Sequence, residues 1–155
     1  MNAAEACICK LKRGLTRKMI CKGSPKCLWD NSLKLEAAIC LNTYLGQISL
    51  ESMTPDEKLK GCTSDISNLC EFKWYDWVMF NNSPSTFPNK NFQLGCWLGP
   101  AADVGSAMTY KILEFNGEFI CRSTLCHLTP DELDNKVHQE QCCLFDARIE
   151  EKLGK

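Results

Sequence analysis

Apolar residues recur at helical spacing near the start of the chain. Ile8, Leu11, Leu15 and Met19 follow one another at three- and four-residue steps. This period predicts an amphipathic helix with one apolar face. Gly23 is typical of a helix end, so we expect the first helix to stop there.

A second helix is predicted directly after this break. The stretch "SPKCLWD" places Ser24 where an N-cap is expected and Pro25 at the first helical position. The pattern then continues to about Asn42. The expected buried face consists of Trp29, Leu33, Ala37 and Cys40. The two helices would form a hairpin, whose apolar faces need a further packing partner that the sequence does not reveal.

The middle of the chain changes from helical to strand character. Residues 47–69 have mixed polarity and no sustained period, which predicts a connector. "FKWYDWVMF", "NFQLGCWLGP", "AMTYKILEF" and "EFICRST" then read as short strands. Asn116-Gly117 predicts a two-residue hairpin turn between the last two. Short strands with turn-rich loops favour a small antiparallel barrel.

The end of the chain is predicted to be helical again. "LTPDEL" is typical of a turn or a helix start, and a second apolar stripe follows it. That stripe consists of Cys142, Phe145, Ile149 and Leu153. The expected fold class is therefore α+β: a helical hairpin over 1–46, a linker over 47–69, a barrel over 70–130 and a helical tail over 131–155.

Charge narrows the classes of partner. The 155 residues carry a net charge of -1, so no global charge points to nucleic acid or to a membrane surface. No apolar stretch approaches the ~20 residues that span a bilayer, so no membrane partner is expected. The N-terminal end is locally basic, however. Against Glu5 stand Lys10, Lys12, Arg13, Arg17, Lys18 and Lys22.

Twelve cysteines raise the question of disulfides or metal. A secreted disulfide framework needs a signal sequence, but Met1 to Ile20 mixes charged with apolar residues. We therefore expect free thiols in a reducing, intracellular compartment, either cytoplasm or nucleus. A zinc module stays open as a weaker alternative, although no C-x-x-C pair is present. Its ligands would come from Cys121, Cys126, His127, His138, Cys142 and Cys143.

Several stretches, taken in order, resemble a known family. They are "NAAEACICKLKRGLTRKM", "SPKCLWDNSLKLEAAICLNT", "TSDISNLCEFKWYDWVMF" and "LGCWLGPAADVGSAMTYKILEFNGEFICRSTLCHLTPDEL". Together they resemble the pol polyprotein of copia-type retrotransposons, from the end of the integrase catalytic core into the following SH3-like barrel. The resemblance implies that 1–46 are the last helices of a truncated RNase H-like core and that 70–130 are the SH3-like barrel.

The resemblance also gives Glu5 a meaning. In that family an N-x-A-E element carries the glutamate of a D,D-E triad, which holds two Mg²⁺ ions for DNA integration. Both partner aspartates lie upstream in the family and have no counterpart here. We therefore expect a polyprotein fragment that is no enzyme in isolation and needs no cofactor of its own. The simpler alternative is that Glu5 only favours the helix dipole from the first turn.

The resemblance further suggests a history for the cysteines. Five of them stand where relatives usually carry Arg, which suggests a decaying copy of a transposable element. They are Cys9, Cys27, Cys40, Cys96 and Cys126. Reverting these five would move the net charge from -1 to +4 (-1 plus 5), the sign expected of a DNA-binding module.

DNA is the expected partner, bound weakly and without sequence preference. The preferred candidate residues are Lys10, Arg13, Arg17, Lys73, Lys111 and Arg122. Lys12 and Lys18 are weaker candidates, because a solvated helix face explains them at least as well. Lys90 is a further candidate on or near the barrel. The aromatic residues Trp74, Tyr75, Trp77 and Trp97 are expected to be core rather than base-stacking. The alternative function is an inactive structural or protein-interaction remnant, which self-associates or binds partner chains through exposed helix faces.

Overall fold

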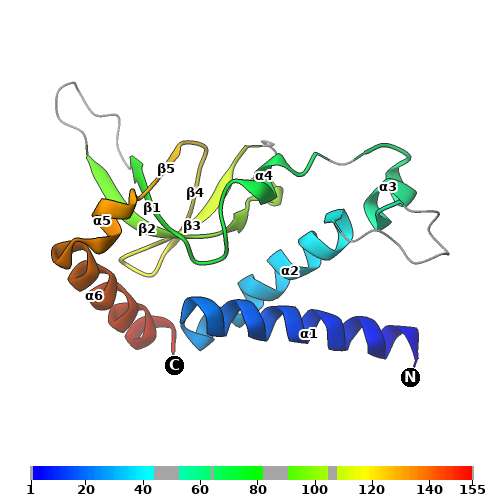
Figure 1. Ribbon diagram of the computed structural model, residues 1–155, viewed down its shortest axis with the longest axis horizontal. Helices are drawn as coiled ribbons and strands as arrows, with labels where there is room; N and C mark the ends of the chain where they lie inside the picture. Colours follow the sequence, from blue (N-terminus) through cyan, green and yellow to red (C-terminus); the bar gives the residue numbers. More distant parts are fainter. Residues whose placement is uncertain (1, 44–52, 64, 82–90, 105–107, 155) are drawn as a thin grey trace.

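The computed structural model describes residues 2–43, 53–63, 65–81, 91–104 and 108–154. It is an α+β arrangement in which two long helices precede an antiparallel sheet and a third long helix follows it (Figure 1). In chain order the elements are α1 (Ala3–Lys22), η1 (Lys26–Leu28), α2 (Trp29–Thr43), α3 (Pro55–Lys60), α4 (Ser67–Cys70), β1 (Trp77–Asn81), β2 (Phe92–Pro100), η3 (Ala102–Val104), β3 (Tyr110–Glu114), β4 (Phe119–Arg122), β5 (Leu125–His127), α5 (Pro130–Asp134) and α6 (Lys136–Leu153).

The first predicted helix is confirmed, with defined caps at both ends. The Asn2 side chain accepts a hydrogen bond from the backbone N–H of Ala4 at 3.1 Å. Glu5 Oε2 in turn accepts from the backbone N–H of Asn2 at 3.1 Å, which completes a capping box. Gly23 ends the helix with a φ of 60°, a left-handed conformation that glycine adopts at little cost.

The second predicted helix exists, but its start differs from the prediction. Ser24 is not its N-cap: the Ser24 hydroxyl accepts a hydrogen bond from Trp74 Nε1 at 3.0 Å, and both residues are buried. The chain instead makes the 3₁₀ turn η1 before α2 begins at Trp29. The Ser24 side chain therefore forms a tertiary hydrogen bond with Trp74 and does not cap the helix.

The predicted buried face of α2 is wrong at Trp29 and only partly buried at its other three positions. Trp29 is 55% exposed, and Leu33, Ala37 and Cys40 are only partly buried. The buried positions of α2 are Asn31, Ser32, Leu35 and Glu36. Helix α2 lies between α1 and strand β2, and Leu35 packs against Gly99 of β2. Because α2 is covered on two sides, its buried positions differ from those that its apolar residues alone predict.

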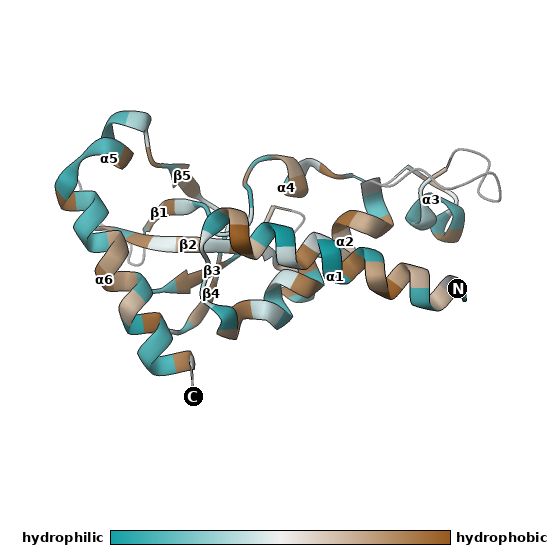
Figure 2. Cartoon of the chain, turned by 60° about the horizontal axis from the view of Figure 1, so that its bottom comes forward, coloured by the Kyte–Doolittle hydropathy of each residue, from teal (hydrophilic) through white to brown (hydrophobic). Residues whose placement is uncertain are grey.

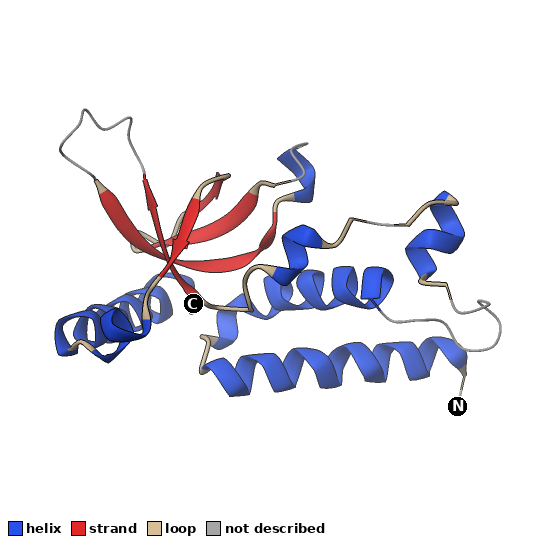
Figure 3. Cartoon of the chain, turned by 45° about the horizontal axis from the view of Figure 1, so that its top comes forward, coloured by secondary structure: helices blue, strands red, loops and turns tan. Residues whose placement is uncertain are grey.

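The strands form one five-stranded antiparallel sheet in the order β4-β3-β2-β1-β5. Val78 opposes Gly95, and Cys96 opposes Leu113, so these pairs define its two faces. A register shift between Trp97 and Gly99 bends β2. In the described residues β4 and β5 are the edges, and the sheet does not close between them. Figure 3 shows the sheet with α6 below it and the α1–α2 pair beside it.

The hairpin at Asn116-Gly117 is confirmed, but not as a two-residue turn. Glu114 and Glu118 still pair through their backbones, which leaves a three-residue loop between them. Gly117 has a φ of 80°, whereas Asn116 has no positive φ. A two-residue turn of type I′ needs positive φ at both central residues, so the chain uses a turn followed by a glycine bulge instead.

The connector contains more regular structure than its sequence pattern indicated. Of residues 47–69, those at 47–52 and 64 lie outside the described part of the chain. The rest includes α3 and α4. Thr54 and Glu57 form a capping box at the start of α3, and Gly61 ends that helix in a left-handed conformation. The Thr-x-x-Glu pattern at 54–57 is a local sequence signal for this helix start, although a connector without regular structure was predicted here.

The two helical predictions for the C-terminal end of the chain are confirmed. "LTPDEL" forms the short helix α5, whose N-cap is Thr129. Helix α6 then buries Phe145 and Ile149, two members of the predicted apolar stripe. Hydrophobic and hydrophilic residues follow one another along the turns of α6 and α1, as expected of amphipathic helices (Figure 2).

One hydrophobic cluster joins the helices to the sheet. Leu28 and Leu35 of the helical hairpin share it with strand residues and with Phe145 of α6. The hairpin therefore has its packing partner within this chain. Three of the four aromatics expected in the core are buried, and Trp77 packs against the cluster. The adjacent residues Trp74 and Tyr75 are both buried, and Tyr75 has a φ of 60°.

Candidate nucleic-acid interface

A basic surface lies on the outer side of α1. Arg13 and Arg17 are exposed, and with Lys12 and Thr16 they border a hollow of about 510 Å³. Among the described residues, neither arginine forms an ion pair with a carboxylate. Lys10 is also exposed and lies further toward the N-terminus. The predicted cations of the first helix thus occupy accessible positions.

On the inner side of α1, the lysine charges are neutralised by carboxylates. Lys18 Nζ lies 2.5 Å from Glu36 Oε2 of α2, and this carboxylate side chain is only 5% exposed. Lys22 Nζ lies 2.5 Å from Asp76 Oδ1 just before β1. Gly14 makes the first pair possible, because a Cβ there would lie 2.1 Å from Glu36 Oε1. These two lysines therefore connect elements of the fold.

A cavity of about 440 Å³ brings together cations that are far apart in sequence. Arg17 and Lys73 both line it, although one belongs to α1 and the other to the segment before β1. Lys73 is exposed, and its backbone N–H donates to Asp76 Oδ2 at 2.8 Å. Two of the predicted DNA-binding residues therefore meet at one place.

The other predicted cations lie elsewhere and already have partners. Lys111 Nζ donates to Asn31 Oδ1 at 2.8 Å and lies 4.7 Å from the centre of the Phe119 ring. Arg122 Nη1 donates to the carbonyl of Cys121 at 2.9 Å. Neither residue lines the cavity at Arg17. Lys90 lies outside the described residues.

Glu5 is the residue that would hold the Mg²⁺ pair implied by the family resemblance. Its carboxylate is exposed and holds the helix cap described above. Two metal ions need several carboxylates around them. Within the described ranges, no group of three or more His, Cys, Asp or Glu side chains could hold a metal ion. The donor set at Glu5 does not fit a metal pair, and we derive no catalytic step from it.

The zinc alternative finds no support in the positions of its candidate ligands. His127 stacks on Phe72, with ring centroids 4.2 Å apart, and its Nε2 lies 3.1 Å from the carbonyl oxygen of Glu71. His138 lies on α6, next to a different cavity. All twelve cysteines are free thiols, and burial raises the pKa of Cys142 to about 11.

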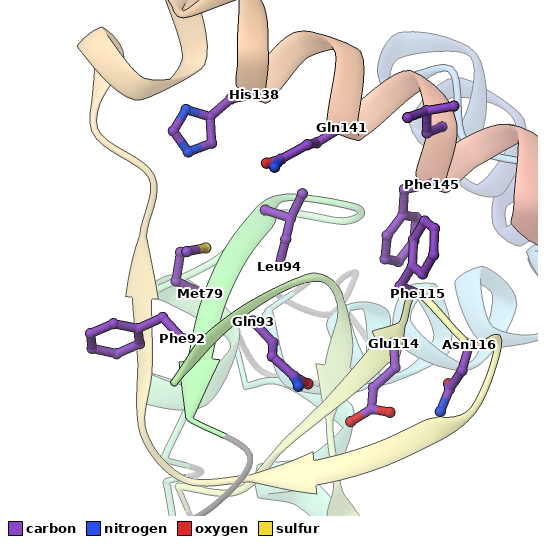
Figure 4. A pocket seen from close by; sticks show the side chains of 11 residues that line it. Met79, Phe92, Gln93, Leu94, Glu114, Phe115, Asn116, His138, Gln141 and Phe145 are labelled. Atoms are coloured by element: carbon purple, nitrogen blue, oxygen red, sulfur yellow. The ribbon is translucent and has the colours of Figure 1, made fainter. Parts of the chain in front are cut away.

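The cavity beside His138 has a volume of about 710 Å³ and lies between α6 and the sheet. Figure 4 shows Met79 and Leu94 directed toward α6, while the side chains of Gln93 and Glu114 point away from it. This cavity was not among the predicted sites. The apolar stripe of α6 was the available signal, but it does not indicate where the helix leaves part of the sheet uncovered.

A partly buried hydrogen bond joins α6 to the segment just before β1. The Tyr75 hydroxyl donates to Asp146 Oδ1 at 2.7 Å. Burial raises the pKa of the Asp146 carboxyl above its ordinary value, although the hydrogen bond from Tyr75 acts in the opposite direction. Burial also raises the pKa of the nearby Cys96 thiol, which has no exposed surface.

Comparisons with protein-family models, with curated proteins and with solved structures found no match to this chain. None of the described helices is long and apolar enough to cross a membrane. The resemblance to retrotransposon integrases therefore stays a prediction from the sequence.

Proposed function

We propose that this chain comes from the integrase region of a copia-type retrotransposon polyprotein and retains weak, sequence-independent DNA binding. In this proposal the five-stranded sheet corresponds to the SH3-like barrel. The return of β5 beside β1 after the meander β1–β4 supports that correspondence. Helices α1 and α2 correspond to the last helices of the RNase H-like core.

The exposed pair Arg13 and Arg17 carries the DNA-binding proposal. Both lie on the solvent side of α1, and neither has a carboxylate partner among the described residues. Lys18 and Lys22, in contrast, are used internally. Cations that are not neutralised within the fold can replace the counterions of a phosphate backbone, which gives binding without base readout.

The same proposal gives Glu5 a structural role in this chain. Its carboxylate caps α1, and DNA strand transfer is not an activity of the isolated chain. The twelve free thiols support a reducing compartment, cytoplasm or nucleus.

Fluorescence anisotropy of a labelled duplex tests the DNA proposal. We expect binding at low salt that weakens steeply as salt rises, because each neutralised phosphate adds about -0.9 to the slope of log K against log salt. The variant Lys10→Ala/Arg13→Ala/Arg17→Ala should lose at least tenfold in affinity. The control Lys34→Ala/Lys58→Ala/Lys136→Ala removes the same charge elsewhere and should bind nearly as the parent does. Equal losses in both variants, or no binding at low salt, would overturn the proposal.

A second candidate function is self-association without DNA binding. Ile8, Ile20 and Leu41 of the helical hairpin are large hydrophobic side chains that remain exposed, and Ile20 is 74% exposed. Such residues favour contact with another chain. Sedimentation velocity at low and high salt separates the two functions, because apolar association persists when phosphate binding is lost.

A further inference from the structure

The cavity at Arg17 and Lys73 has the size and lining of a small-molecule site. Its volume of about 440 Å³ lies in the range of ligand pockets in proteins. Its floor is apolar and comes from two parts of the fold: Leu35 of α2, and Phe72 and Trp74 before β1. All three side chains are buried in the hydrophobic cluster.

The charges around this cavity do not balance. Four cations line it, namely Arg17, Lys18, Lys22 and Lys73. Glu36 pairs with Lys18, and Asp76 pairs with Lys22. Among the described residues, Arg17 and Lys73 have no ion-pair partner. The opening therefore carries two positive charges that an anion could neutralise.

A buried donor in the wall also lacks a partner. Trp97 lines the cavity and is only 1% exposed, yet its Nε1–H has no acceptor within the part of the chain that the structure describes. The neighbouring Trp74 shows the usual arrangement, since its Nε1–H donates to Ser24. A buried N–H without an acceptor costs about 1–3 kcal/mol, so an acceptor at this place would be favourable.

We propose that this cavity binds an amphipathic organic anion. The apolar part of the ligand lies against Leu35, Phe72 and Trp74. Its carboxylate or phosphate is held by Arg17 and Lys73, and one of its oxygen atoms accepts from the Trp97 indole. The site goes beyond the proposed DNA binding, because a duplex offers phosphates but no apolar body that could enter this cavity.

A matched set of ligands distinguishes the sources of such chemistry. Decanoate and decyl phosphate share an apolar chain and differ in the anionic group. Decanol has the same chain without charge. Isothermal titration calorimetry of the full reduced chain, with each compound below its micelle-forming concentration and without DNA, measures the three affinities. We expect one saturable site for at least one anion, with at least tenfold weaker binding of decanol.

Variants then locate the site. Arg17→Gln/Lys73→Gln should weaken binding of the preferred anion at least tenfold. Lys58→Gln/Lys136→Gln removes the same charge from residues outside the cavity and should change affinity less than twofold. Circular dichroism establishes that both variants fold as the parent does. Equal affinity for decanol and the anions would mean unspecific apolar uptake and would overturn the proposal, as would an unchanged affinity in the Arg17/Lys73 variant. Because no DNA is present, either result leaves the DNA assay independent.

Discussion

At the scale of single residues, Asp146 has the clearest pH-dependent effect. Its carboxyl is half-buried and accepts a hydrogen bond from Tyr75, and burial raises its pKa. The folded state therefore binds this proton more strongly than the unfolded chain does. The contribution of Asp146 to stability falls as pH rises from the ordinary pKa near 3.8 through the raised value, and it stays low above that.

Asp146→Asn should therefore stabilise the protein at pH 7. The amide keeps an acceptor for Tyr75 and cannot ionise. We expect a gain of roughly 0.5 kcal/mol, a small value because solvent screens a half-exposed group. The difference should vanish near pH 3. Urea unfolding at both pH values measures it, with Tyr75→Phe as a control that should destabilise by about 1 kcal/mol. A less stable Asn variant at pH 7 would show that the charge itself is favourable.

Cys96 tests the suggestion that some cysteines replaced arginines. This thiol has no exposed surface, whereas Cys9 is exposed on α1. Cys96→Arg would bury a guanidinium and should destabilise by about 3 kcal/mol or more. Cys9→Arg should stay within about 0.5 kcal/mol of the parent. Thermal unfolding of both variants checks this. A stable Cys96→Arg protein would instead indicate that the guanidinium reaches Asp146, which lies near Cys96.

At the scale of elements, Gly14 controls how α1 meets α2. Ala has the higher helix propensity by about 1 kcal/mol, so Gly14→Ala would stabilise an isolated helix. In this fold the new Cβ would lie 2.1 Å from Glu36 Oε1 and displace a buried carboxylate from Lys18. We expect a net loss of about 1–3 kcal/mol in chemical denaturation. Thr16→Ala, on the exposed side of α1, should cause no such loss. A stabilised Gly14→Ala protein would contradict the close packing described above.

Some helix boundaries can be predicted from the sequence alone, and others cannot. The helix ends at Gly23 and Gly61 and the caps at Thr54 and Thr129 depend on residues close in sequence, so they can be predicted locally. The start of α2 and its buried face could not be predicted in this way. Ser24 bonds to a tryptophan 50 positions away, and that contact is invisible to local pattern.

In the candidate site, too, some features follow from the local sequence and others only from tertiary packing. Exposed cations on α1 were predictable from helical period, because a polar stripe opposite an apolar one faces solvent. The pairing of Lys18 with Glu36, and the meeting of Arg17 with Lys73, depend on how the helices pack on the sheet. Residue type gave Lys111 and Lys73 equal weight as DNA contacts, but only the fold shows that Lys111 already bonds to Asn31.

At the scale of the whole molecule, the packing predicts the order of proteolysis. Leu28 of η1 and Leu35 of α2 belong to the central hydrophobic cluster, whereas α1 contacts mainly α2. Trypsin should therefore cut first at Lys10, Lys12 and Arg13 on α1. Fragments in which α2 stays with the sheet should persist several-fold longer, because opening them disrupts the shared core.

Mass spectrometry over a time course of limited trypsin digestion follows these fragments. Cleavage within the basic stretch of α1 before any cut between η1 and the end of α2 would support a core that extends from α2 through the sheet to α6. Lys26 and Lys34 provide the comparison sites, because both are exposed yet belong to the elements that pack on the sheet. Equal early cleavage at Lys34 and Lys12 would mean that the helical hairpin opens as one unit and that its contacts with β2 contribute little stability.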